Sequence, residues 1–236
     1  MNIFKNEVTV DVHDIDPSGV ARVSSLMKYI QSAAELQLSD IGRSYDELKS
    51  MKRAFILSKI KLEAYEPIRP YEKLSAETFP CPSRAYTFLR CYQLKRGGET
   101  VARAISSWAL IDTENRSLVK VSDFELGLTE INPFELSVSR IVMPDSLTPL
   151  GEYRVTYADL DRNGHMNNTR YPDMYSNFLD LKGKRIDSIS ISFLNEARPG
   201  ELISLFGAKL GDTVYIRSVR EDGKLNSEAE IHITEI

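Results

Sequence analysis

The sequence predicts an α+β protein made of two similar halves, each with one helix packed against an antiparallel sheet. Three observations predict this class: an internal repeat, one amphipathic helical pattern in each half, and a series of strand-like segments after each helix. A helix with one apolar face must bury that face against the apolar face of a sheet, which gives a layered α+β structure.

The internal repeat relates residues 7–31 to residues 153–177. Each segment reads as an alternating strand, a turn with two aspartates and a glycine, and then a helix. The turns coincide after a shift of 145 residues (159 − 14), which places Asp14 on Asp159, Asp16 on Asp161 and Gly19 on Gly164. Later segments also correspond, since IRPYEKLSA at Ile68 is similar to ARPGELISL at Ala197. The two halves therefore share one plan.

Each half contains one helical pattern of apolar residues. In the first half the pattern runs from Leu26 to Ile41 and stops at Gly42. In the second half the apolar residues are spaced i, i+3, i+4, i+7 and i+8, and the pattern ends at residues 182–184. Its members are Tyr171, Met174, Tyr175, Phe178 and Leu179. Strand-like segments then follow at 186–194, 201–209, 212–221 and 226–235, so each half reads β-α-β-β-β-β.

Segment composition places the domain boundaries. We expect an N-terminal unit at 1–130, a linker at 131–150 and a C-terminal unit at 151–236. The linker region contains three prolines and no convincing long helix, which favours a segment that crosses between the two units.

The overall composition narrows the function classes. The 236 residues are 42% hydrophobic and 27% charged, as in a globular chain that buries a large core. A net charge of −4 argues against general nucleic-acid binding, and no apolar run approaches the ~20 residues of a membrane helix. The N-terminal region lacks the pattern of a secretory signal, and we interpret Cys81 and Cys91 as inert thiols. We therefore expect a cytoplasmic protein in a reducing compartment.

The segment DLDRNGHMNN, residues 159–168, has three readings. Its first six letters match a calcium loop, but the twelfth position of that loop should be glutamate and here is Arg170. A turn from strand to helix explains the same letters, with Asn167 or Asn168 as a helix cap. The third reading is an enzyme site, because the first-half copy DIDPSGVAR makes the same turn without any histidine or asparagine.

The side chains found only in the second copy are suited to adding water to an acyl group. His165 stands where the first half has Val20, and a histidine side chain can act as base and acid near neutral pH. Asp161 can orient it or hold water, while Asn163 and the amides at the helix start can stabilise an oxyanion. Glu196 supplies a second acid just before a turn, although a solvated turn glutamate explains it equally. This chemistry needs no metal and no cofactor.

Three stretches of the chain carry a resemblance to a known family. DLDRNGHMNNTRY at Asp159, AISSWALIDTENRSLVKV at Ala104 and VDVHDIDPSGVARVSSLMKYIQ at Val10 together resemble the acyl-ACP thioesterases, which release fatty acids from acyl carrier protein. The resemblance implies a tandem, or double, hotdog, with a long helix wrapped by an antiparallel sheet in each half. It assigns Asp161, Asn163, His165 and Glu196 to the catalytic set. Plant members have a cysteine directly after this glutamate, whereas this chain has Ala197, so that nucleophile is lacking here.

The resemblance also implies a substrate and a division of labour. The first half would line the acyl chain with Met27, Ile30 and Ala34, and Asn167 and Asn168 would contact substrate near the catalytic set. The expected reaction is hydrolysis of acyl-acyl carrier protein to free fatty acid and holo-acyl carrier protein, which ends fatty acid synthesis. Alternatives are an acyl-CoA thioesterase and a non-catalytic acyl-binding hotdog protein. The expected partner is acyl carrier protein, with neither nucleic acid nor membrane, and a homodimer is left open.

Overall fold

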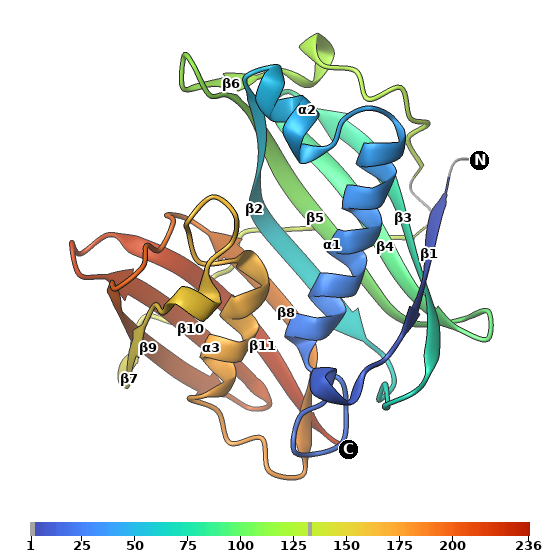
Figure 1. Cartoon of the computed structure of the whole chain (residues 1–236). Coiled ribbons are helices and arrows are strands. Elements are labelled where there is room, and N and C mark those ends of the chain that lie inside the picture. Colours follow the sequence, from blue (N-terminus) through green and yellow to red (C-terminus); the bar gives the residue numbers. More distant parts are fainter. Residues whose placement is uncertain (1–2, 132–133) are drawn as a thin grey trace.

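One antiparallel sheet of eleven strands dominates the molecule (Figure 1). The structure is a computed structural model that describes residues 3–131 and 134–236. In the first half the strands are β1 (Phe4–Thr9), β2 (Arg53–Ala64), β3 (Lys73–Arg84), β4 (Thr87–Arg96), β5 (Glu99–Asp112) and β6 (Ser117–Val119). In the second half they are β7 (Thr148–Arg154), β8 (Lys184–Phe193), β9 (Leu202–Leu210), β10 (Thr213–Arg220) and β11 (Leu225–Glu235).

The strand order shows how the two halves join. It runs β1-β3-β4-β5-β2 through the first half and continues as β8-β11-β10-β9-β7 through the second, with β6 paired to β5. The junction is the antiparallel pair of β2 and β8, in which Lys59 to Glu63 lie opposite Ser192 to Ser188. Each half also begins with an edge strand, β1 or β7, that precedes its helix in the chain. The halves therefore repeat one topology within a continuous sheet, as the internal repeat predicted.

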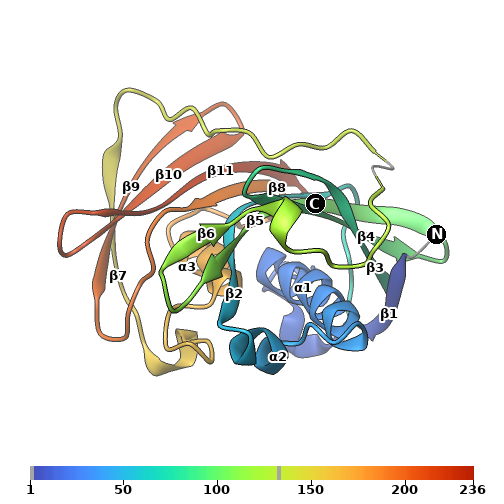
Figure 2. The same cartoon turned by 90° about the horizontal axis from the view of Figure 1, so that it is seen from above.

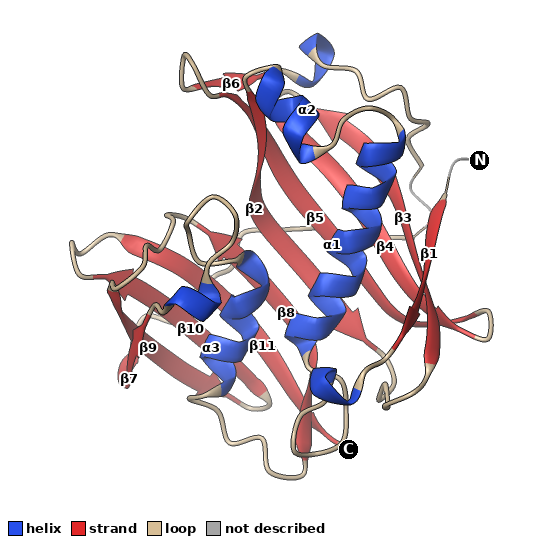
Figure 3. Cartoon of the chain, viewed as in Figure 1, coloured by secondary structure: helices blue, strands red, loops and turns tan. Residues whose placement is uncertain are grey.

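The first helix, α1 (Val23–Asp40), confirms the helical pattern predicted for the first half. Its buried side includes Leu26, Met27, Ile30 and Ala34, and the strands of the first half curve around it (Figure 2). The chain leaves the helix through Gly42, whose φ of +68° is easily adopted only by glycine. A short helix, α2 (Tyr45–Ser50), follows at the top of this layer (Figure 3).

The second helix is shorter than predicted. α3 spans Tyr171–Ser176 and follows a 3-10 helix at Asn168–Arg170, so the description of a long helix fits only the first half. The amides of Phe178 and Leu179 donate to carbonyls three residues back, which tightens the chain into turns beyond Ser176. Those turns keep both side chains packed against the core, which is why the apolar spacing continues past the helix.

The double hotdog predicted from the sequence is confirmed by this arrangement of helix and sheet in each half. The four strands predicted in the second half correspond to β8 to β11, with ends that differ by one or two residues. Residues 148–150, which we expected in the linker, belong to β7, and residues 132–133 of the same linker lie outside the described residues. Across the ranges that the structure describes, no helix is long and apolar enough to cross a membrane.

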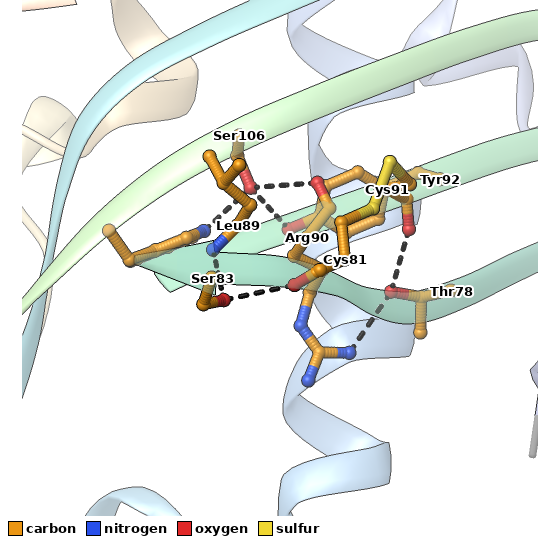
Figure 4. Close-up of a disulfide and its surroundings, with 9 residues drawn as sticks. Thr78, Cys81, Ser83, Leu89, Arg90, Cys91, Tyr92 and Ser106 are labelled. Atoms are coloured by element: carbon orange, nitrogen blue, oxygen red, sulfur yellow. Dashed lines mark hydrogen bonds between the residues drawn. A yellow bond between two sulfur atoms is a disulfide. The ribbon is translucent and has the colours of Figure 1, made fainter. Parts of the chain in front are cut away.

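The two cysteines form a disulfide, so the interpretation of Cys81 and Cys91 as thiols is wrong. They lie on neighbouring strands, β3 and β4, with Cα atoms 6.2 Å apart (Figure 4). The bond belongs to a small second core with Phe79 and Ile105, against which Phe134 of the linker region packs. The sequence spacing gave no hint of this pairing, because register across a hairpin decides which side chains meet. Disulfides persist mainly in oxidising surroundings, so this one runs against the reducing compartment that we expected.

Candidate active site

The turn before each helix is built from the same hydrogen bonds in both halves. The Asp161 amide donates to the His165 carbonyl at 2.8 Å, and the Asp16 amide donates to the Val20 carbonyl at 2.9 Å. Each aspartate also accepts, through Oδ1, the backbone N–H groups two and four residues ahead. Gly19 and Gly164 occupy the same positive-φ position, at +80° and +78°. The aspartate and glycine are therefore requirements of the turn itself.

Only the second copy adds chemically capable side chains to this turn. His165 is partly exposed, and its Nε2 lies 3.2 Å from Oε2 of Glu196, whose side chain is 55% exposed. The sequence-predicted pair, separated by 31 residues (196 − 165), is thus brought together. Asp161 touches the backbone of His165 and not its ring, so it holds the histidine through the turn.

Glu196 is held in place by a buried polar network below it. The backbone amides of Leu194 and Asn195 donate to the carbonyl of Asn226, which is fully buried on β11. The Asn226 side-chain amide donates to the Asn195 carbonyl at 2.6 Å and to the Tyr171 hydroxyl at 2.9 Å. Burial raises the pKa of Tyr171 to about 12. The segment that carries Glu196 is therefore fixed from the sheet side.

Asn163 is positioned from the other half of the molecule. The hydroxyl of Tyr45 on α2 donates to Asn163 Oδ1 at 2.6 Å, and Asn163 Nδ2 donates to Asp161 Oδ2 at 3.3 Å. Next to this contact the Arg162 guanidinium lies 3.6 Å from the centre of the Tyr45 ring and pairs with Asp46 at 2.9 Å. With Oδ1 occupied by a donor, the Asn163 amide presents its NH₂ group and keeps one N–H for a ligand.

The asparagines after the histidine act partly as a cap. Asn167 Oδ1 accepts the amide and the hydroxyl of Thr169, both at 2.9 Å, and the Asn167 carbonyl accepts the Arg170 amide. Two of the helix-start amides that we expected to face an oxyanion are thus occupied within the protein. Asn167 and Asn168 both line the cleft described next, where a bound substrate could reach them, as predicted.

A cleft of about 1660 Å³ connects these side chains with the first half. Asp161, Asn163, His165 and Glu196 line it on the second-half side. On the first-half side its apolar lining includes Phe55, Leu57, Phe88, Trp108 and Leu48. Of the three residues predicted to line an acyl chain, Ala34 borders the cleft, whereas Met27 and Ile30 are fully buried in the core and do not line it.

Glu35 and Arg90 are two of the charged side chains in the first-half part of the cleft. Glu35 projects from α1, and burial raises the pKa of its carboxyl, an effect partly offset by the charge of Arg162. Arg90 on β4 is only 7% exposed, and burial lowers the pKa of its guanidinium. In the described ranges, no group of three or more His, Cys, Asp or Glu side chains is placed to hold a metal ion.

Sequence reasoning missed the residues that support the site from a distance. Tyr45 reaches the site from α2 and lies 118 residues from its partner Asn163 in the chain. Asn226 reaches the site from β11. A tyrosine at a helix start and an asparagine in a strand carry no local signal for such roles. Only the internal repeat, which isolates residues 159–168, could have shown where to look for partners.

The fold and this site define a hotdog protein in which only the second half carries the histidine and asparagine side chains in the turn before its helix. The chain matches the family description "Acyl-ACP thioesterase N-terminal domain" over residues 1–126 and "Acyl-ACP thioesterase C-terminal domain" over residues 146–235. The protein therefore belongs to the acyl-ACP thioesterase family.

Individual relatives are distant in sequence and near in fold. The oleoyl-acyl carrier protein thioesterase 2, chloroplastic, of Arabidopsis thaliana is 21% identical over 247 residues, which cover 95% of this chain and 62% of that relative. This chain thus spans less than two thirds of the relative's length. Solved structures of an acyl-ACP thioesterase from Bacteroides thetaiotaomicron and a 12:0-ACP thioesterase from Umbellularia californica superpose with TM-scores of 0.89 and 0.81. At 20% and 14% identity, over 98% and 99% of this chain and 98% of each of theirs, they show the shared fold.

Proposed function

We propose that the protein hydrolyses the thioester of acyl-acyl carrier protein, giving free fatty acid and holo-acyl carrier protein and so ending fatty acid synthesis. The observation that carries this proposal is the pairing of His165 with Glu196, at 3.2 Å, where the second half meets a large cleft lined by apolar side chains of the first half. Membership of a thioesterase family agrees with this chemistry.

The geometry supports a division of roles between the two paired groups. A neutral imidazole that donates from Nε2 to Glu196 leaves Nδ1 of His165 free to accept a proton from water. The resulting hydroxide adds to the thioester carbonyl, and Asn163 Nδ2 donates to the oxygen that becomes negative. When the carbon–sulfur bond breaks, the protonated His165 returns its proton to the leaving thiolate. Glu196 holds the imidazole and stabilises its charge during these steps.

Positive side chains at the mouth of the cleft support an acidic protein partner. Arg162 is more than half exposed, and Arg198 lines the same mouth beside Glu196. Acyl carrier protein is acidic and carries its acyl group on a thiol, so it matches both features. The proposal includes a cytoplasmic location, against which the disulfide argues.

Single-residue variants test the site. We expect His165→Ala and Glu196→Ala to lower kcat for acyl-acyl carrier protein by at least ~100-fold, the size of losing an acid–base group. Glu196→Gln should retain more activity than Glu196→Ala, because an amide oxygen still accepts from Nε2. Equal loss in the two Glu196 variants would instead make the carboxylate the base, and unchanged turnover in both alanine variants would remove the site from the reaction.

The same assay separates the alternative functions. Acyl carrier protein thioesters and coenzyme A thioesters of matched acyl groups should be compared at equal concentration. We expect a higher kcat/KM for the carrier-protein series, whereas a preference for coenzyme A would identify an acyl-CoA thioesterase. No hydrolysis of either series would indicate an acyl-binding protein.

A further inference from the structure

The first-half part of the cleft contains a buried cation that no carboxylate neutralises. Arg90 is 7% exposed and lines the cleft from β4. Its Nη1 donates to Gln37 of α1 and, at 3.1 Å, to the Thr78 hydroxyl. Within the described residues, Arg90 forms no ion pair with a carboxylate, and both hydrogen bonds of its guanidinium come from Nη1. A buried guanidinium is costly unless it is paired and its donors are satisfied.

Strand order places Arg90 away from the catalytic groups. The cleft is lined successively by Phe193 of β8, Phe55 of β2, Trp108 of β5 and Phe88 and Arg90 of β4, which are neighbours in that order in the sheet. With strands about 4.8 Å apart, β4 lies about 14 Å from β8, which precedes Glu196 in the chain. An acyl chain whose thioester lies at His165 and which extends under α1 would therefore bring its far end towards Arg90.

The internal partners of this cation are neutral side chains, Gln37 and Thr78. Glu35, a carboxylate that lines the same cleft, interacts electrostatically with Arg162, and in the described residues no ion pair joins it to Arg90. The other face of β4 carries Cys91, whose disulfide lies on the opposite side of the strand from the Arg90 guanidinium (Figure 4). The guanidinium thus places charged hydrogen-bond donors beside the apolar side chains of Phe88 and Trp108.

We propose that Arg90, held by Gln37 and Thr78, forms a subsite for an oxygen-bearing group at the far end of the acyl chain, with a carboxylate as the best match. This inference rests on the proposed function, since it names the class of acyl group that the thioesterase site would release. A purely alkyl chain would leave the Arg90 donors without partners, whereas a terminal hydroxyl or carboxylate would satisfy them.

The test compares thioesters of one chain length whose far end is a methyl, a hydroxyl or a carboxylate. We expect the wild-type kcat/KM to be at least ~10-fold higher for the oxygen-bearing ends than for the methyl end, the size of a charge-assisted hydrogen bond. In Arg90→Met this ratio should fall by at least ~10-fold. Arg90→Lys keeps the charge but loses the planar set of guanidinium donors, so its ratio should lie between those of the wild type and Arg90→Met. If Arg90→Met does not fold, the fall in Arg90→Lys carries the test.

A matched control excludes a general effect of removing an arginine. Arg103 lies on β5 over the Phe134 ring and does not line the cleft, so Arg103→Met should leave the ratio unchanged. A wild-type preference for the methyl end, or an unchanged ratio in Arg90→Met, would overturn the subsite. If no thioester is hydrolysed, the proposed function fails. Calorimetry with dicarboxylic and monocarboxylic acids of equal length then tests the subsite. Tighter binding of the dicarboxylic acid that is lost in Arg90→Met would support the subsite, and equal binding of the two acids would overturn it.

Discussion

At the scale of single residues, comparing the two halves separates residues that the turn requires from the candidate catalytic side chains. Asp16 and Asp161 make the same turn bonds, yet only Asp161 stands beside a histidine and an asparagine that face a cleft. An aspartate in this motif would therefore be needed for folding even where no chemistry takes place. The candidate catalytic side chains that distinguish the two turns are Asn163 and His165, which stand where the first half has Ser18 and Val20.

A pair of equivalent substitutions tests this separation. Asp16→Ala and Asp161→Ala each remove the acceptor for two backbone N–H groups, so each should lower the free energy of unfolding by about 1–3 kcal/mol in urea titrations. Only Asp161→Ala should also lower kcat, by at least ~10-fold, because the backbone of His165 and the side chain of Asn163 lose their anchor. A similar fall in kcat for Asp16→Ala would show that the loss reflects stability alone.

At the scale of elements, the short helix α2 positions a side chain of the other half, because its Tyr45 bonds to Asn163. Ser44 and Glu47 form a reciprocal cap at its start, and the hydrogen bonds from Ser44 lower the pKa of Glu47. This cap allows a helix of six residues to hold Tyr45 against Asn163 in the turn of the other half. By contrast, α3 is short because the chain forms turns with hydrogen bonds three residues back after Ser176, although the apolar spacing of the sequence continues.

Removal of one hydroxyl on α2 tests its role. Tyr45→Phe deletes the hydrogen bond to Asn163 Oδ1 and keeps the ring beneath Arg162. Because the Asn163 side chain then keeps only its longer hydrogen bond to Asp161, we expect kcat to fall by about 5- to 10-fold with little change in KM or in melting temperature. Tyr157→Phe is the matched control, since that side chain is 92% exposed, and its kinetics should equal those of the wild type. A rise in KM at constant kcat would assign Tyr45 to substrate binding instead.

At the scale of the whole molecule, repetition made the fold predictable while long-range contacts remained hidden. The repeat and the spacing from Leu26 to Ile41 predict the halves and α1, because periodicity directly reports a buried face. Likewise, the contrast between the two turns isolates the catalytic candidates. The disulfide, the Tyr45 contact and the buried Arg90 depend on strand register and on packing between distant segments, for which one sequence carries no local signal.

The continuous sheet predicts that the two halves unfold together. Ile60 of β2 and Ile191 of β8 are fully buried opposite each other at the junction, so separating the halves would expose core and an unpaired strand edge. Trp108, the single tryptophan, lies in the first half and reports on that half by fluorescence. Ile216→Ala on β10 of the second half opens a cavity costing about 2–5 kcal/mol. We expect it to shift the Trp108 transition and the far-ultraviolet circular dichroism transition equally. A fluorescence midpoint that stays at the wild-type value would mean that the halves unfold independently despite the shared sheet.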